Sequence, residues 1–216
     1  MKKVFYAIAI SAISVGCSNP NESTDDTKVT EVKAKPSTST VCSYSYENAN
    51  STIAWTAFKF TEKVGVGGTF NTLTVSGNNS AETMFQVFEG LRFNIPVSSV
   101  NSNNPDRDMK IQKYFFANLS EMENIEGFFS NINENGEGML SLVMNGRSQE
   151  VPVQLEARGD SVFLNTSIDV QMWDGMSGIE ALNQVCEDLH KGADGLSVLW
   201  PNVDLSLSTK LNKECN

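Results

Sequence analysis

The chain is poor in the residues from which most catalytic and metal sites are built. Its 216 residues include one histidine, His190, and four cysteines. A serine or cysteine nucleophile would have only that one imidazole to act as its base, and the sequence contains no G-x-S-x-G motif. The cysteine spacing fits no zinc-binding pattern. We therefore predict that the protein is not an enzyme and that it uses no cofactor and no metal.

Runs of basic residues are also missing. The formal net charge is −10, from 16 lysines and arginines against 26 aspartates and glutamates. Binding to nucleic acid or electrostatic docking to anionic lipid depends on clustered positive charge. The sequence therefore predicts no nucleic-acid partner, and it argues against electrostatic attraction to an anionic membrane surface. The acidity is most simply explained by solubility.

Two polar clusters remain as weak candidates for chemistry. Asp188 and Asp194 flank His190, but their spacing fits no metal site, and we interpret His190 as a solvent-facing, partly cationic residue near a helix C-terminus. Asp106 and Asp108 flank Arg107. Paired carboxylates can serve as acid and base, but an arginine held by two loop aspartates is more often a structural fastener, and we favour that interpretation.

The first residues have the features of an export signal. Two lysines precede an apolar run over residues 4–15, which is too short to span a bilayer as a helix. The run ends in "SVGC", which resembles a bacterial lipobox. We therefore expect residues 1–16 to be a signal peptide and Cys17 to be acylated; an ordinary signal cleaved near Gly16 is the alternative. Because Ser18 follows Cys17, we expect an outer-membrane lipoprotein that faces the periplasm of a Gram-negative bacterium.

Residues 17–41 are expected to form a flexible linker, because they are polar and contain no aromatic residue. The remaining residues, 42–216, suffice for one domain. Most of this domain alternates apolar and polar residues with a period of two, and Asn145-Gly146 is a strong hairpin signal. The pattern predicts an antiparallel β sandwich or barrel. The strands are expected at residues 43–46, 52–60, 70–75, 85–97, 139–146, 150–158, 160–172 and 197–211.

Two segments break this alternation and are expected to be helical. One covers about residues 110–116. The other, residues 177–190, begins with Ser177 and Glu180 as a capping box and can end at Gly192. Its apolar residues form one stripe at helical spacing that we expect to face the core. The stripe consists of Ile179, Leu182, Val185, Cys186 and Leu189.

The glycine-rich stretch "VGVGGTF", residues 64–70, raises the possibility of a phosphate-binding loop. It lacks the lysine and the serine or threonine of such a loop, and no helical pattern follows it. The next residues alternate like a strand. We therefore interpret Gly65, Gly67 and Gly68 as a bulge or sharp bend in a barrel strand, with Phe70 pointing inward.

Three stretches of the sequence resemble the YceI-like family. They are "STIAWTAFK…VGVGGTF", "SSVNSNNPDRDMKIQKYFF" and "LVMNGRSQEVPVQL", and the similarity extends over about residues 43–211. The resemblance implies an all-β fold, an extended eight-stranded antiparallel β barrel that is lipocalin-like and carries one or two helices. It also implies that a long apolar lipid, of the isoprenoid or quinone type, is enclosed in the barrel. This sequence departs from the family at Lys59, where many members have histidine.

The inward-facing apolar positions of the expected strands are the candidates for contact with such a lipid. On periodicity alone, each of them is equally well explained by packing in a filled core, so a non-catalytic interaction lipoprotein with a solid barrel and acidic loops is the alternative function. The candidate ligand-binding residues are Ile53, Trp55, Phe70, Leu91, Phe93, Ile95, Leu142, Met144, Val153, Leu155, Trp200 and Leu205.

Given such a barrel, the last strand is expected to pair with the first, which brings Cys42 and Cys215 together. Export places the cysteines in an oxidising compartment, where one disulfide is plausible. A Cys42–Cys215 bridge is our prediction, with Cys186 left as a buried thiol. Bridges between Cys186 and Cys215 or between Cys42 and Cys186 remain open.

Overall fold

The computed structural model describes residues 40–77, 80–120 and 123–216. The chain divides into two compact units, Met1–Thr38 and Ser39–Asn216. The expected signal peptide, the expected acylation site Cys17 and all but the last two residues of the expected linker lie outside the described residues. Within the described residues, no helix has the length and apolar character needed to cross a membrane.

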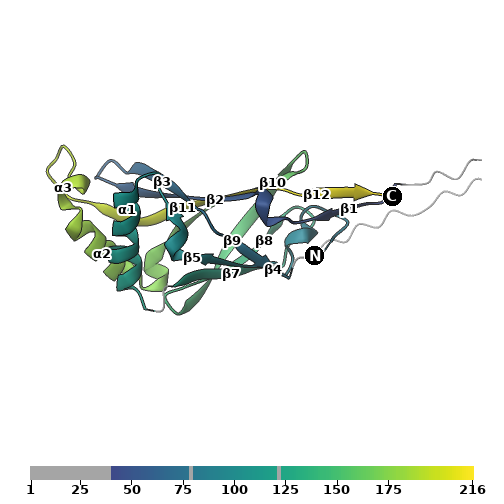
Figure 1. Cartoon of the computed structure of the whole chain (residues 1–216), viewed down its shortest axis with the longest axis horizontal. Helices are drawn as coiled ribbons and strands as arrows, with labels where there is room; N and C mark the ends of the chain where they lie inside the picture. The colour runs from purple at the N-terminus through teal and green to yellow at the C-terminus, as the bar shows by residue number, and fades with distance from the viewer. Residues whose placement is uncertain (1–39, 78–79, 121–122) are drawn as a thin grey trace, which may run out of the picture. The chain divides into compact units, whose positions relative to one another are not determined.

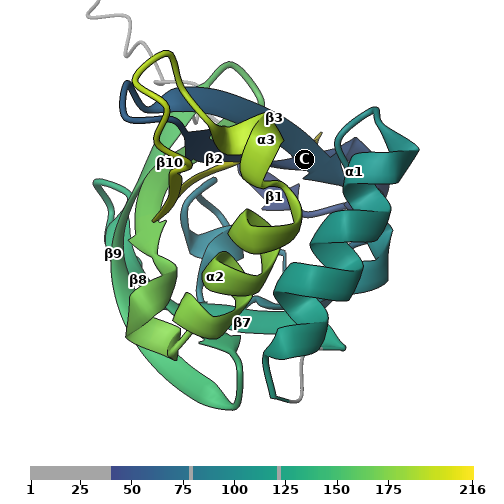
Figure 2. The same ribbon diagram turned by 90° about the vertical axis from the view of Figure 1, so that its left-hand side faces the viewer.

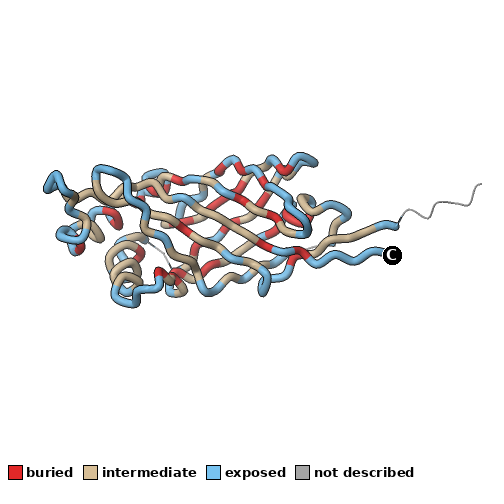
Figure 3. The backbone as a smooth tube through the Cα atoms, turned by 90° about the horizontal axis from the view of Figure 1, so that it is seen from above, coloured by how far each residue is buried: buried red, intermediate tan, exposed pale blue. Residues whose placement is uncertain are grey.

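The second unit consists mainly of antiparallel strands, ten of which form one curled sheet (Figure 1). Buried residues recur along these strands (Figure 3), and buried and exposed residues alternate most regularly over residues 151–156, as the period-two sequence pattern predicts there. In pairing order the strands are β4 (Thr74–Ser76), β5 (Arg92–Pro96), β7 (Asn124–Ser130), β8 (Glu137–Met144), β9 (Arg147–Arg158), β10 (Ser161–Asp169), β11 (Leu199–Lys210), β2 (Ser51–Lys59), β3 (Val64–Phe70) and β6 (Val100–Asn101).

The expected count of eight strands is wrong, because two segments of the chain are interrupted. Residues 71–73 separate β3 from β4, and the 3-10 turn η3 (Val97–Ser99) separates β5 from β6. Pro96 precedes this turn and has no N–H to continue the ladder. The two interrupted segments nevertheless pair with each other twice, β4 with β5 and β3 with β6. Between these pairings, the backbone N–H of Asn71 donates to the carbonyl of Ser99 at 2.8 Å.

A second irregularity lies between β9 and β10. Only the last four residues of β9, from Leu155 onward, pair with β10 in the described structure. The 3-10 turn η6 (Val170–Trp173) lies beside the part of β9 without a partner in β10, where Gln149 donates to the carbonyl of Met172 at 2.9 Å. Trp173 is buried there, and its indole N–H donates to the carbonyl of Leu142 at 2.9 Å. This partly unpaired stretch also accommodates Pro152, since proline is tolerated where no ladder bond is required.

The first and last strands leave the curled sheet and form a separate two-stranded ribbon. β1 (Cys42–Ser45) pairs antiparallel with β12 (Asn212–Cys215), and Cys42 lies opposite Cys215. A disulfide joins these two cysteines, and Cys186 is a buried free thiol. The structure therefore contains the predicted bridge, but the first expected strand belongs to the ribbon and not to the sheet. The short turn η1 (Asn48–Asn50) leads from β1 into β2.

The sheet is densely packed at the end next to this ribbon, which we call the ribbon end. The 3-10 turn η2 (Gln86–Phe88) inserts Val87 and Phe88 there, and the exposed fraction of Phe88 is 0%. Its ring contacts that of Phe129 edge to face, with centroids 5.6 Å apart. Leu155, Val162, Thr209 and Leu211 are fully buried at the same end.

Helices cover the opposite end, which we call the helical end. Figure 2 looks onto it and shows α1 (Pro105–Lys110), α2 (Met176–Val185) and α3 (Glu187–His190) lying across the sheet's mouth. The helix expected at residues 110–116 is instead α1 followed by a π-helical turn, η4 (Ile111–Phe115), and a 3-10 turn, η5 (Phe116–Asn118). Asn104 caps α1, because its side chain accepts a hydrogen bond from the N–H of Arg107.

The long helix expected at residues 177–190 is broken at Cys186 into α2 and α3. The expected capping box is wrong. Gly175 is the N-cap of α2 and makes no side-chain cap bond, while the hydroxyl of Ser177 donates to the carbonyl of Asn118 at 3.1 Å. Part of the expected stripe is buried, as Ile179 and Cys186 show, but Val185 and Leu189 are exposed.

The glycine-rich stretch is strand and not a bend. All of residues 64–70 belong to β3, and β3 pairs with β2 without a register shift from Ala54 to Lys59. The expectation of a bulge at the glycines is therefore wrong. The hairpin at Asn145-Gly146 is confirmed, because both residues have positive φ, 50° and 67°, as a type I′ turn between β8 and β9 requires.

Candidate functional site

The inner face of the curled sheet encloses a cavity of about 520 Å³. Its walls come from strands on every side of the sheet, and α1, α2 and α3 contribute to it at the helical end. Aliphatic and aromatic side chains make up most of the lining. A concave, predominantly apolar cavity of a few hundred Å³ is typical of a site for a small apolar molecule.

The structure brings most of the candidate ligand-binding residues together around this cavity. They come from five different strands, with Leu91 just before β5. The sequence alone did not place these strands next to one another. The candidates that line the cavity are Ile53, Trp55, Phe70, Leu91, Phe93, Ile95, Leu142, Met144, Trp200 and Leu205.

Val153 and Leu155 lie outside the cavity lining. Both are buried on β9, with exposed fractions of 7% and 1%, and pack into the main core. The N–H of Leu155 donates to the carbonyl of Gly136 at 2.8 Å, so this part of β9 is pressed against the loop before β8. Their position in an alternating strand correctly indicates burial, but it does not distinguish the packed ribbon end from the hollow part of the sheet.

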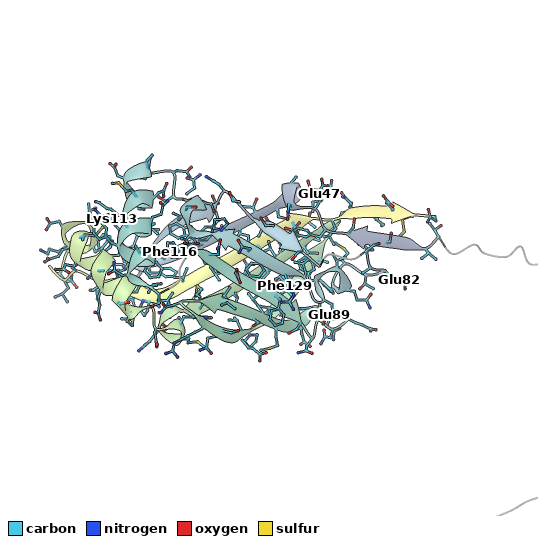
Figure 4. The ribbon with its side chains drawn as sticks, turned by 60° about the horizontal axis from the view of Figure 1, so that its bottom comes forward. Glu47, Glu82, Glu89, Lys113, Phe116 and Phe129 are labelled. Carbon is cyan, nitrogen blue, oxygen red and sulfur yellow. A yellow bond between two sulfur atoms is a disulfide. The ribbon has the colours of Figure 1, made fainter. Side chains whose placement is uncertain are left out.

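Aromatic residues that were not among the predicted ligand-binding residues also line the cavity. Phe115 does so from η4, and Phe116 and Phe129, which Figure 4 labels, do so from η5 and β7. The sequence analysis did not predict β7, although Ile125, Gly127 and Phe129 alternate with the less buried Glu126 and Phe128. That alternation is a sequence signal from which the strand could have been predicted. A π-helical turn followed by a 3-10 turn has no simple sequence period, so the cavity-lining residues of η4 and η5 could not be predicted in this way.

Two cavity-lining aromatic residues lie over glycines of neighbouring strands. Trp55 is directly opposite Gly68, and Phe93 is directly opposite Gly127. A Cβ at Gly68 would lie 2.4 Å from the ring of Trp55, and one at Gly127 would lie 2.5 Å from the ring of Phe93. The glycines of the "VGVGGTF" stretch therefore include one that makes room for the tryptophan, whose indole N–H donates to the carbonyl of Thr69 at 3.3 Å.

The polar lining residues gather mainly at the helical end. Lys59 lies at the end of β2, and its Nζ donates to the carbonyl of Leu189 at 2.9 Å. Asn104, Asp106, Arg107 and Lys110 line the cavity from the start of α1 and its cap. The cavity is therefore apolar along the sheet and polar where it meets the helices.

The residues around Arg107 are arranged differently from the expected fastener. Asp108 accepts hydrogen bonds from the backbone N–H and the hydroxyl of Ser102, at 2.7 and 2.6 Å. Among the described residues, Arg107 forms no ion pair with Asp106 or Asp108. Asp108 therefore fixes the loop before α1, while Asp106 and Arg107 line the cavity.

His190 is half-buried, which corrects the expectation of a solvent-facing, partly cationic residue. Its Nδ1 lies 2.8 Å from Oδ1 of Asn183, and the hydroxyl of Ser197 donates to the same oxygen at 3.1 Å. Burial, together with the positive charges of Lys59 and Lys110, lowers the pKa of His190 to about 4. His190 is therefore neutral at neutral pH and helps to fasten α3 to α2 and to the loop before β11.

The expected absence of a metal-binding cluster can be compared with the structure only within its described part. No group of three histidine, cysteine, aspartate or glutamate residues there is placed to hold a metal ion. Asp194 instead accepts a hydrogen bond from the hydroxyl of Thr61 at 2.6 Å, which lowers the pKa of its carboxyl group. Asp188 lies 3.8 Å from the ammonium group of Lys191.

The described residues therefore form a curled antiparallel sheet around an apolar cavity, with helices over one end. The sequence matches the YceI-like domain over residues 44–211, and the chain belongs to the YceI-like family. A search of curated proteins gave no match.

Two solved structures share the fold. One is a polyisoprenoid-binding domain from Saccharophagus degradans implicated in plant cell wall breakdown, at 16% identity and a TM-score of 0.56. The match covers 80% of this chain and 98% of that domain. The other is BcnA from Burkholderia cenocepacia, at 12% identity and a TM-score of 0.51, which covers 78% of this chain and 99% of BcnA. At these identities the likeness describes the fold alone.

Proposed function

We propose that the protein binds and carries a long apolar lipid of the isoprenoid or quinone type and catalyses no reaction on it. The observation that supports this proposal most strongly is the cavity of about 520 Å³ with its aliphatic and aromatic walls. Burying apolar surface stabilises a complex by roughly 25 cal/mol per Å², so an alkyl or prenyl chain is the occupant that such walls favour. A cavity of this volume argues against the alternative of a solid, filled barrel.

The strand pairing supports a lipocalin-like container. β3 and β4 can be counted as one interrupted strand, and so can β5 and β6, which leaves eight strands around the sheet. These two interrupted strands pair with each other, β4 with β5 and β3 with β6, and this pairing joins the two edges of the sheet. Eight-stranded barrels are wide enough to hold one small ligand. The similar domain from Saccharophagus degradans is described as polyisoprenoid-binding, and we extend that ligand class to this chain as part of the proposal.

We further propose that acylated Cys17 tethers the domain to the outer membrane, on its periplasmic side. The support is the lipobox-like "SVGC" sequence and the polar residues that follow it. The roughly 23 residues between Cys17 and Val41 would span on the order of 25 Å as a flexible chain and up to about 80 Å when extended, so a domain tethered at its ribbon end could still turn its opposite end to the membrane. The tethered domain therefore remains close to the membrane from which an apolar lipid would be drawn.

Native mass spectrometry of protein purified from its own host, followed by organic extraction, tests the ligand. The wild type is expected to carry a lipid at about one molecule per chain. The variant with both Trp55→Ala and Phe93→Ala is expected to lose most of it, because these two rings form the wall over Gly68 and Gly127. Truncation of a buried aromatic residue costs about 3–5 kcal/mol of stability, so circular dichroism must first establish that the variant is folded. A folded double variant with full lipid content would contradict the proposal.

A further inference from the structure

The cavity has its opening at the helical end. Among the described residues that line the cavity, only Asn104, Asp106 and Leu189 are exposed. The first two lie at the start of α1, and Leu189 lies on α3 with an exposed fraction of 57%. Side chains that line a cavity and also face solvent mark the place where it reaches the surface. The opening therefore lies between the start of α1 and α3.

Exposed apolar residues gather at the helical end. Apart from Met172 on η6, which lies against β9, five of the seven large apolar residues that are exposed in the described part of the chain come from segments of this end. These segments touch one another: Lys59 bonds the carbonyl of Leu189, and the N–H of Phe60 donates to the carbonyl of Val198 at 3.0 Å. We call these five residues the apolar rim, which consists of Val64, Met109, Val185, Leu189 and Leu196.

Charge is distributed unevenly between the helical end and the remainder of the domain. The segments of the helical end, which are residues 59–63, 105–118, 145–147 and 169–198, contain seven of the eleven lysines and arginines in the described chain and nine of its 21 acidic residues. The remaining described residues carry four basic and 12 acidic side chains. The helical end is therefore only weakly negative, whereas the body of the domain is strongly negative. Figure 4 illustrates this contrast, with Lys113 at the helical end and Glu47, Glu82 and Glu89 toward the ribbon end.

We propose that the apolar rim docks on the surface of a lipid bilayer and that lipid enters and leaves the cavity there. Apolar side chains inserted at the level of the head groups, with lysines beside them, are the features by which proteins bind a bilayer interface. An anionic membrane surface repels the acidic body of the domain more strongly than it repels the helical end. This difference turns the domain so that the opening of the cavity faces the membrane. The net negative charge of the whole chain does not predict this orientation. Only the fold shows that the lysines and arginines are concentrated at the helical end and most of the acidic residues elsewhere.

This inference rests on the proposed lipid cargo. A lipid that leaves a bilayer for a protein cavity is exposed to water unless the opening contacts the bilayer, and exposure of a long chain is strongly unfavourable. Leu189, which lines the cavity and is also exposed, provides an apolar path from the bilayer to the cavity. The ribbon end offers no such path, because its interior is filled by Val87 and Phe88.

Hydrogen exchange of the full chain, with and without vesicles of phosphatidylethanolamine and phosphatidylglycerol, tests the docking. Amides of residues 61–66, 105–113 and 185–198 are expected to exchange about tenfold more slowly with vesicles. Amides of β1 and β12 are expected to be unchanged. Protection of the ribbon end instead, or no protection by vesicles at either end, overturns the proposal.

A variant with Met109→Ser and Leu196→Ser provides the matched comparison, since neither residue lines the cavity. The variant is expected to lose the protection and to take up lipid from vesicles about tenfold more slowly. Val41→Ser is the control, because Val41 lies next to the ribbon and is 59% exposed, as is Leu196. A second outcome would also overturn the proposal. If the amides of the apolar rim became more protected as the protein concentration rose in the absence of vesicles, the rim would bind a second copy of the chain and not a bilayer.

Lipid extraction from the same samples separates the two proposals. A wild type that carries lipid but shows no rim protection contradicts the docking and leaves the proposed cargo standing. A wild type without lipid contradicts the cargo itself, whatever the exchange pattern.

Discussion

The two ends of the domain are built from the same strands but differ in almost every physical respect. At the ribbon end, Phe88 is completely buried and packs edge to face on Phe129, and the Cys42–Cys215 bridge joins the first and last strands. At the helical end, short helices leave Leu189 exposed while it still lines the cavity. The contrast indicates that the ribbon end is the more stable one, as expected if the proposed ligand enters at the other end.

The interactions that stabilise the two ends of the domain differ in kind. The ribbon end has a covalent bridge in addition to the apolar core. At the helical end, α2 contributes Ile179 to that core, whereas single polar contacts connect α3 and the loop before β11 to the end of β2 and the residues that follow it, such as Lys59 with the carbonyl of Leu189 and Thr61 with Asp194. An exposed hydrogen bond of this kind contributes only about 0.5–1.5 kcal/mol. The α3 segment and the loop before β11 can therefore move at a cost far below that of unfolding the sheet.

The largest predicted effect concerns the bridge. It closes a loop of 173 residues, for which the chain-entropy account gives a stabilisation of about 5 kcal/mol. The variant with Cys42→Ser and Cys215→Ser is expected to lose up to about that much free energy of unfolding, as measured by urea denaturation. Cys186→Ala, which removes a buried thiol without breaking a bridge, is expected to cost clearly less. Equal stability of the double variant and the wild type would mean that the ribbon does not fasten the domain.

A matched pair of truncations compares the two ends directly. Phe88→Ala, at the ribbon end, is expected to cost about 3–5 kcal/mol, because it empties a fully buried site. Leu189→Ala, at the helical end, is expected to change the free energy of unfolding by no more than about 0.5 kcal/mol, since the side chain is largely exposed. Chemical denaturation of both variants provides the comparison. Similar losses for the two would remove the proposed division between a stable end and an accessible end.

The smallest expected effect is a dependence of stability on pH that comes from the helical end. The pKa of His190 in the folded protein is about 4, below its ordinary value of 6.5. The unfolded chain therefore binds the additional proton between these two pH values, and the free energy of unfolding falls as the pH is lowered from about 6.5 to about 4. Comparison of unfolding curves for the wild type and His190→Gln isolates this contribution from that of the carboxyl groups. The variant is expected to have a shallower slope over this interval, and an unchanged slope would contradict the neutral, half-buried imidazole.

The sequence revealed the antiparallel architecture because alternation with a period of two and the Asn145-Gly146 turn are local signals. It also placed the aromatic residues of β2 and β5 correctly on the inner face. It did not reveal the interruptions at residues 71–73 and at η3, because these depend on where the sheet must bend to bring its two edges together. The role of Gly68 was equally hidden, since only the register of β2 with β3 brings this glycine under Trp55.

The character of the helical end was the least accessible to sequence analysis. A helical stripe was recognised, but its break at Cys186 and the exposure of Val185 follow from how α2 packs on η4 and β11. The low pKa of His190 likewise depends on Lys59 and Lys110, which are far from it in the sequence. Such properties arise where distant segments meet, and no single window of the sequence contains them.

The most direct test of the account is the lipid content of two matched tryptophan variants on β2. Ala57 lines the cavity, whereas Ala54 does not, and both are half-buried. Native mass spectrometry of folded protein from its own host is expected to find that Ala57→Trp, which fills the cavity, carries little or no lipid. Ala54→Trp is expected to retain about one lipid per chain. Full lipid content in Ala57→Trp, or an equal loss in both variants, would contradict a lipid held inside the curled sheet.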